Sequence, residues 1–295
     1  MRVSLAMVGM IFIWSTVPLG AKWSIAGQHY FFGASSRVLV AASLALVWML
    51  LSRRSLPLDR KAIANYILSA CNFVAWILMY WGMQFIPSGW MGISIGVMPL
   101  ITAVLVAIWL DEDAFTPLKV GGLLVGFVGI LVVFATAFDV GIDSLLGLSA
   151  VTLATSVAAA VPVAMRRLDV EGVPFDTVCG GLLFAMPVYL LFWIFSDFQW
   201  PLEISHRASL AALYIGSFGT LLIFTLYFYT LQHLLITQVA LMGMVTPVAS
   251  LLLGIVLNNE PMSLRIGVGA SLIVIALLLH EYLPRRLAAA NQIQT

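Results

Sequence analysis

Four charged residues are the groups of this sequence that could do chemistry inside an apolar protein. Lys22 and Arg37 are the basic residues that reach into long apolar segments. A cation in such a place either binds the carboxylate of a ligand or donates hydrogen bonds to backbone carbonyls. Glu112 and Glu260 each follow an apolar segment and precede an expected helix start. A carboxylate there either stabilises the loop and the helix dipole or makes a gate contact that opens and closes.

Catalysis and metal binding find no comparable support in the sequence. An enzyme needs a nucleophile with a base, or a cluster of metal ligands. None of the four histidines lies near an acidic residue within the membrane interior, since His280 and Glu281 stand at the cytoplasmic end of the last expected span. Proton relays within a membrane usually use Asp, Glu or His, and none of these lies near the middle of an expected span. We therefore expect no enzyme activity, no cofactor and no metal, and favour facilitated diffusion or exchange over proton antiport.

A further group of residues has no reason to face lipid and could line a cavity for a small solute. It consists of polar and aromatic side chains, Asn72 and Thr155 among them, and of two prolines that free a backbone carbonyl inside their segments. Aromatic residues near segment ends, such as Trp90, fit the membrane interface equally well. The predicted substrate-binding residues are Trp14, Ser15, Thr16, Arg37, Tyr80, Gln84, Trp90, Pro99, Tyr227, Gln238, Thr246 and Pro247. Lys22, Glu112 and Glu260 are the predicted gate or structural residues.

Composition identifies the elements that must position these groups. The chain is 62% hydrophobic and 9% charged, with a mean hydropathy of +1.07, whereas soluble domains carry about 25% charged residues. These values are typical of an all-α protein that crosses the membrane many times. Apolar stretches long enough to cross a bilayer predict ten spans, at 4–22, 32–51, 62–85, 89–110, 117–138, 145–165, 177–196, 208–232, 236–257 and 263–283.

The distribution of basic residues predicts the orientation of these spans. Cytoplasmic loops retain lysine and arginine, and an N-terminus inside places ten of the 14 basic residues on the cytoplasmic side. The four that remain outside are Lys22, Arg37, Arg207 and Arg265. The sequence therefore predicts both termini in the cytoplasm.

The sequence also repeats itself. A shift of 148 positions places Gln84 on Gln232, Pro99 on Pro247 and Glu112 on Glu260. We expect a first repeat at residues 1–140 and a second at 141–295, which ends in a short cytoplasmic tail. Five spans per repeat is an odd number, so the second repeat starts on the opposite side of the membrane. Inverted repeats of this kind allow one central cavity to face either side in turn.

These residues carry a resemblance to a known family. Trp14-Ser15-Thr16, Arg37, and the string from Tyr80 through Pro99 to Glu112 with its copy ending at Pro247 and Glu260 resemble the drug/metabolite transporter superfamily, in particular its ten-helix EamA-type exporters. The resemblance implies an inner-membrane exporter of amino acids or other small metabolites. The segment Asp111-Glu112-Asp113 departs from the family pattern, which more often has a basic residue after the glutamate.

The function expected from these observations is export of a small organic metabolite by alternating access. An amino acid or a related compound is the expected substrate. The expected partners are a small-molecule substrate and the lipid bilayer of a bacterial inner membrane, with the protein acting as a monomer. A net charge of +1 gives no basic surface for nucleic acid. A nucleobase, sugar or drug-like compound is the alternative substrate, and a membrane receptor or scaffold is the alternative from another class.

Overall fold

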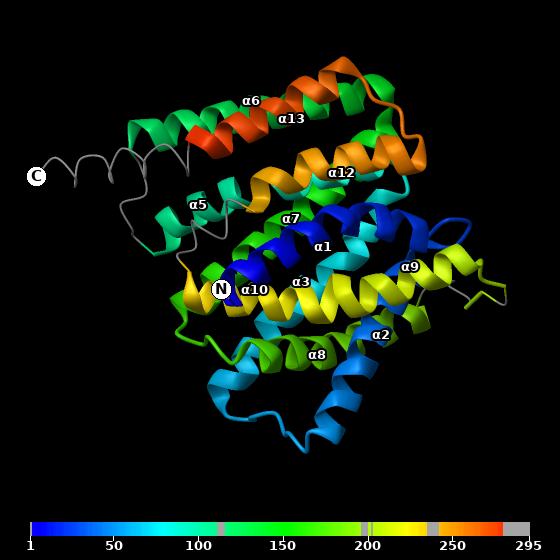
Figure 1. Cartoon of the computed structure of the whole chain (residues 1–295), viewed down its shortest axis with the longest axis vertical. Helices are drawn as coiled ribbons and strands as arrows, with labels where there is room; N and C mark the ends of the chain where they lie inside the picture. Colours follow the sequence, from blue (N-terminus) through cyan, green and yellow to red (C-terminus); the bar gives the residue numbers. More distant parts are fainter. Residues whose placement is uncertain (1, 111–115, 196–199, 202, 235–241, 280–295) are drawn as a thin grey trace, which may run out of the picture.

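The computed structural model describes residues 2–110, 116–195, 200–201, 203–234 and 242–279, and within them the regular elements are all helical. Figure 1 shows them as one bundle. The helices are α1 (Arg2–Ser24), α2 (Tyr30–Leu51), α3 (Arg60–Met83), α4 (Ser88–Gly96), α5 (Met98–Trp109), α6 (Pro117–Val140), α7 (Ile142–Arg167), α8 (Pro174–Phe195), α9 (His206–Gly216), the π-helix η1 (Ser217–Leu222), α10 (Ile223–His233), α12 (Met242–Asn258) and α13 (Leu264–Leu277).

These elements agree with the ten expected spans. Eight stretches are long and apolar enough to cross a membrane, with α4 and α5 forming one stretch and α9, η1 and α10 another. Two shorter apolar helices, Val245–Asn258 and Leu264–Leu277, supply the ninth and tenth. Glu112, Gln238 and the expected C-terminal tail lie outside the described residues. The protein is therefore an all-α membrane protein of the expected size and span number.

The local sequence explains where several helices begin. Thr116 and Ser263 act as N-caps, as the sequence predicts, with their hydroxyls accepting from the amides of Lys119 and Ile266. Pro99 stands at the start of α5 directly after a break at Val97, because proline cannot donate the backbone hydrogen bond that a continuous helix needs. Its counterpart Pro247 differs, since α12 runs through it without interruption.

Close backbone contacts hold the bundle together. In Figure 1, α6 and α13 lie side by side along one edge, and α1 lies against α12. A Cβ at Gly129 of α6 would come within 3.0 Å of the Gly269 carbonyl of α13. A Cβ at Gly82 of α3 would clash with the Gly147 carbonyl of α7. Small residues at these points let helices in a membrane approach closely.

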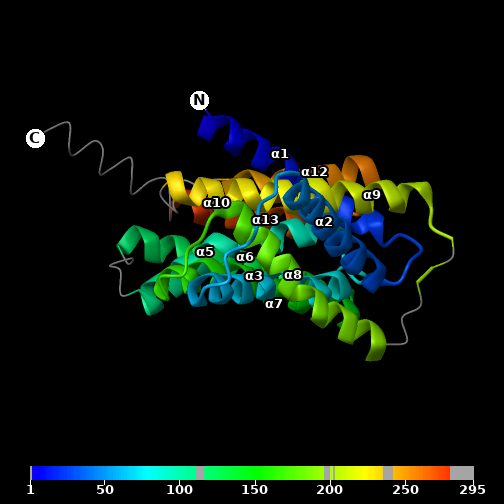
Figure 2. The same ribbon diagram turned by 90° about the horizontal axis from the view of Figure 1, so that it is seen from below.

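The outer surface suits lipid. Leu124, Phe127 and Leu131 of α6 are exposed, as are Trp48 and Leu50 of α2. Exposed apolar surface of this extent would be unfavourable in water, whereas hydrocarbon chains solvate it. Figure 2, turned by 90° from Figure 1, shows α9 and α10 following one another in a single line across the molecule.

The alternating chain direction gives the bundle two ends, which we name by one residue each. The Glu260 end contains the ends of α1, α3 and α12 and the starts of α4 and α9. The Arg54 end contains the ends of α2, α7 and α10 and the starts of α3 and α8. The predicted orientation places the Arg54 end in the cytoplasm.

Candidate substrate cavity

A cavity lies between helices of both halves of the chain. It contains about 660 Å³ of unoccupied space, including its open side. The lining side chains are mostly aromatic or methionine, with few polar groups among them: Trp14, Val17, Arg37, Asn72, Trp76, Met79, Met91, Ile95, Met98, Thr155, Ala158, Val161, Pro162, Phe224, Tyr227 and Phe228. Such a mixture is typical of sites for small organic ligands.

Helical spacing brings these side chains to one surface. Asn72, Trp76 and Met79 follow one another on α3 at intervals of one turn, and Phe224 and Phe228 do so on α10. Val161 and Pro162 belong to the last two turns of α7, whose end lies at the Arg54 end. The cavity therefore extends from the middle of the bundle toward the Arg54 end.

Arg37 is the positively charged residue among the described lining residues, and it is only 3% exposed. Its Nε donates to Thr220 Oγ1 at 2.8 Å and its Nη2 to the Gly219 carbonyl at 2.7 Å. Its Cζ lies 3.6 Å from the centroid of the Trp76 ring, which is close enough for a cation–π interaction. These contacts hold the guanidinium in one orientation.

The acceptors for Arg37 come from an irregular segment of helix. Gly219 and Thr220 belong to η1, which separates α9 from α10. Besides accepting from Arg37, the Thr220 hydroxyl donates to the Ile215 carbonyl at 2.9 Å, five residues back along the chain. Single π-helical turns inside α-helices are frequent at functional sites. Sequence reasoning did not predict this segment, because no proline or charged residue marks it.

Two polar groups of the cavity are buried with unused hydrogen-bonding capacity. Asn72 is 5% exposed and Tyr227 8% exposed. Within the described residues neither side chain has a hydrogen-bond partner, although the Tyr227 ring packs against Trp14 with centroids 5.4 Å apart. Buried polar side chains normally find a partner. An occupant of the cavity could supply one.

A tight seam between α4 and α12 runs from the middle of the bundle to the Glu260 end. Gly89, Gly92 and Gly96 of α4 face Leu251, Ser250 and Pro247 of α12, and a Cβ added at Gly92 or Gly96 would clash with the facing side chain. The Ser250 hydroxyl also donates to the Ser15 carbonyl of α1 at 3.1 Å. The seam thus joins α4 of the first half to α12 of the second.

Glu260 holds the outer end of this seam. Its two carboxylate oxygens accept from the amides of Ser88 and Gly89, the first residues of α4, at 3.0 and 3.1 Å. Asn258 donates a third hydrogen bond at 2.9 Å. The left-handed conformation of Asn259, with φ 51°, turns Glu260 back toward the bundle. The carboxylate therefore caps a helix of the other half rather than the helix that follows it.

Lys22 has a complementary position beside it. Its Nζ donates to the carbonyls of Met83 and Ile86, at 2.5 and 2.9 Å, where α3 ends. A cation at the last carbonyls of one helix and a carboxylate at the first amides of the next are the arrangements that helix dipoles favour. Lys22 and Glu260 thus hold the short connection between α3 and α4 from both sides.

The predicted substrate-binding residues do not all meet at the cavity. Trp14, Arg37 and Tyr227 line the cavity. Ser15, Thr16, Tyr80, Trp90, Thr246 and Pro247 are buried or half-buried elsewhere in the bundle, Pro99 is half-buried beside Met98 of the cavity, and Gln84 is exposed at the end of α3. Gln238 lies outside the described residues. Ser15 and Thr16 donate to carbonyls of their own helix, 2.7 and 2.8 Å away.

The prediction missed the apolar part of the lining. Trp76, Phe224 and Phe228 are aromatic residues inside apolar spans, so nothing in the sequence distinguishes them from core residues. Asn72 was recognised as a polar residue in a span, and its spacing from Trp76 and Met79 would have extended the site along α3.

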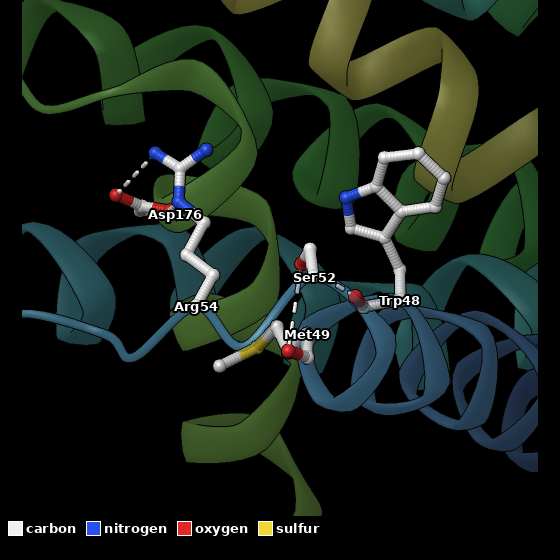
Figure 3. A network of polar contacts seen from close by, with 5 residues as sticks. All are labelled: Trp48, Met49, Ser52, Arg54 and Asp176. Carbon is white, nitrogen blue, oxygen red and sulfur yellow. Dashed lines mark hydrogen bonds and ion pairs between the residues drawn. The ribbon is translucent and has the colours of Figure 1, made fainter.

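The Arg54 end carries its own links between the halves. Arg54, in the connection after α2, contacts the Asp176 carboxylate in the first turn of α8 through Nε at 3.1 Å and Nη2 at 3.2 Å, as Figure 3 shows. In the same figure the Ser52 hydroxyl donates to the Trp48 carbonyl at the end of α2. Nearby, Lys61 donates to Asp169 and holds the pKa of that carboxyl below its usual value.

The helical bundle, the lipid-facing surface and the cavity between the helices define a multi-pass membrane protein with an internal cavity. The model of the EamA-like transporter family matches this chain twice, over residues 1–135 and 145–280, and the chain belongs to that family. It is a membrane transporter of small solutes, and its family belongs to the drug/metabolite transporters, in agreement with the resemblance seen in the sequence.

Individual relatives are distant but cover almost the whole chain. "Uncharacterized transporter YoaV" of Bacillus subtilis (strain 168) is 22% identical over 95% of this chain and 97% of its own length. "WAT1-related protein At3g02690, chloroplastic" of Arabidopsis thaliana is 26% identical over 94% of this chain and 68% of its own. A solved crystal structure with 20% identity covers 97% of this chain and 98% of its own, with a TM-score of 0.67. That likeness concerns the fold.

Proposed function

We propose that this protein exports amino acids or related small organic metabolites across a bacterial inner membrane by alternating access. The observation that supports the proposal most directly is the cavity, which takes side chains from α1 to α5 of the first half and from α7 and α10 of the second. A site between two halves can be exposed to either side by movement of one half against the other.

The tight seam between α4 and α12 gives the proposal a direction. In the predicted orientation the Glu260 end faces outward, so we propose that the seam closes the cavity to the outside while the cavity extends toward the cytoplasm. Opening the α4–α12 seam would expose the same cavity to the exterior. We further propose that the protein acts as a monomer, because the two halves already supply both walls of the cavity.

Counterflow in proteoliposomes tests the proposal. Liposomes preloaded with unlabelled amino acids should accumulate labelled amino acid from outside transiently, with or without a pH gradient. Accumulation that requires the gradient would contradict the preference for exchange over proton antiport. Accumulation driven only by preloaded nucleobases, sugars or drug-like compounds would favour the alternative substrates, and none with any solute would favour a receptor or scaffold.

A further inference from the structure

The charge balance of the cavity points to the charge of its ligand. Arg37 is the cationic lining residue, and the described lining residues include no Asp or Glu. Its two hydrogen-bond acceptors, a hydroxyl and a backbone carbonyl, are both neutral. A buried charge without a counter-charge is unfavourable in a low-dielectric interior. An anion bound in the cavity would relieve that cost, whereas a cation would add to it.

The hydrogen-bonding capacity of the site agrees with this balance. A guanidinium has five N–H donors; hydrogen bonds engage Nε and Nη2 of Arg37, and the neutral Tyr80 hydroxyl also lies beside the guanidinium. The Asn72 amide, one turn from Trp76, adds further donors without a partner in the described part of the chain. A carboxylate accepts several such bonds at once, and those to a charged group are the stronger kind.

The rest of the lining selects the body of the ligand. Trp14, Phe224 and Phe228 present aromatic surface, and Met91 and Met98 present flexible apolar side chains that adapt to different shapes. None of these residues can replace the hydration of an ammonium group by a counter-charge. The rings offer the ammonium of an amino acid cation–π attraction of about 0.5–2 kcal/mol, but no counter-charge like the one that Arg37 offers a carboxylate.

We propose that the cavity is a binding site for organic carboxylates with an apolar body, held by Arg37, and that an ammonium group on the ligand is not required. The proposal deepens the proposed function, because it extends the substrate class from amino acids to carboxylic acids that lack the amino group. It concerns binding at the same cavity and can be tested separately from transport.

The first experiment measures binding of labelled 3-phenylpropionate to the purified protein in detergent. Phenylalanine and 2-phenylethylamine serve as competitors, because they share the phenyl body and differ in charge. We expect phenylalanine to compete, and 2-phenylethylamine to need at least about tenfold higher concentrations, the factor expected for loss of one charge-assisted hydrogen bond. Absence of 3-phenylpropionate binding, or equal competition by the amine, would overturn the proposal.

Substitutions then test the role of Arg37. Arg37→Gln should weaken 3-phenylpropionate binding at least about tenfold, and Arg37→Lys should retain part of it, since lysine keeps the charge without the planar fork. The matched control is Arg207→Gln, because Arg207 also stacks on a tryptophan, with its Cζ 4.2 Å from the Trp23 ring, but lies exposed at the Glu260 end. Binding by folded Arg37→Gln that equals the unsubstituted protein would overturn the assignment.

Two further results separate this proposal from neighbouring ones. If Arg37→Gln fails to fold, Arg37→Lys decides: it keeps the cation but loses the planar fork, so folded Arg37→Lys should bind 3-phenylpropionate more weakly than the unsubstituted protein, and equal binding would overturn the assignment. Carboxylate binding without counterflow in liposomes would refute export and leave the anion site standing. Counterflow of phenylalanine that 2-phenylethylamine inhibits as strongly as 3-phenylpropionate does would refute the anion site and leave export standing.

Discussion

Glu260 and Ser88 are 172 positions apart in the sequence, yet the carboxylate of one accepts a hydrogen bond from the backbone amide of the other at 3.0 Å. The contact joins the end of α12 to the start of α4, and so joins the two halves of the chain. It lies at the Glu260 end of the seam between α4 and α12. Breaking it is the most direct way to loosen that seam.

Glu260→Gln should therefore destabilise the described conformation. Glutamine keeps one acceptor oxygen and loses the charge, so we expect a loss of about 2 kcal/mol and an altered exchange rate. Thermal unfolding in detergent and counterflow measure the two effects. Ser263→Ala is the control, because it removes the N-cap of α13 without touching the seam. Equal effects of both substitutions on exchange would mean that Glu260 only fixes its loop.

The glycine seam gives a second prediction. A Cβ at Gly92 would clash with Ser250, whereas a Cβ at Gly121 of α6 would meet no atom within 4 Å. We expect Gly92→Ala to force α4 and α12 apart and lower the unfolding temperature. Gly121→Ala should add about 0.5–1 kcal/mol of helix propensity to the free energy of unfolding, and so raise the unfolding temperature slightly. If Gly92→Ala is as stable as Gly121→Ala, the tight seam is not required.

The π-helix next to Arg37 gives a third prediction. Thr220→Val leaves a buried guanidinium N–H without its acceptor, so we expect it to cost about 1–3 kcal/mol. Thr225→Val is a matched change on the next turn of the same span, where the hydroxyl bonds only the Leu221 carbonyl of its own helix, and it should cost less than about 0.5 kcal/mol. Chemical unfolding of both variants provides the comparison. Similar losses would show that Thr220 contributes nothing through Arg37.

The ion pairs at the Arg54 end give a fourth prediction. Arg54→Gln removes the ion partner of Asp176, whose side chain is 9% exposed. Since the Arg54 side chain is 42% exposed, solvent reduces the effect, and we expect a loss of about 1–2 kcal/mol. Lys61→Gln breaks the fully exposed pair with Asp169 and should leave the unfolding temperature unchanged. A larger effect of Lys61→Gln would contradict this ranking.

Much of the fold could be predicted from the sequence, because lipid requires long apolar helices and each of these is visible as a run of apolar residues. The N-caps Thr116 and Ser263 could also be predicted, since capping depends on neighbours along the chain. Glu260 could not be placed by the same local reasoning. Glu260 stands close in sequence to the start of α13, which predicts a contact there. The turn at Asn259 directs its carboxylate instead to the amide of Ser88 at the start of α4, in the other half of the chain.

The cavity was harder to predict, because the rotation of each helix about its own axis decides which of its residues face the cavity. Polar residues were expected to face it, but a hydroxyl in a helix can bond the preceding turn, as those of Ser15 and Thr16 do, and then needs no cavity. Trp76 and Phe224, which do line it, look like core residues in the sequence. Arg37 stood out because a charge inside an apolar span has few acceptable environments.

We propose that one cavity between the two halves opens to each side of the membrane in turn. Ala158 lines this cavity, so Ala158→Cys, in a protein whose Cys71 and Cys179 are replaced, reports access to a membrane-impermeant thiol reagent added from one side at a time. We predict labelling from the side of the Arg54 end at rest, and labelling from the other side as well when Gly92→Ala is added. Labelling from neither side, or from one side only in both proteins, would contradict alternating access through this cavity.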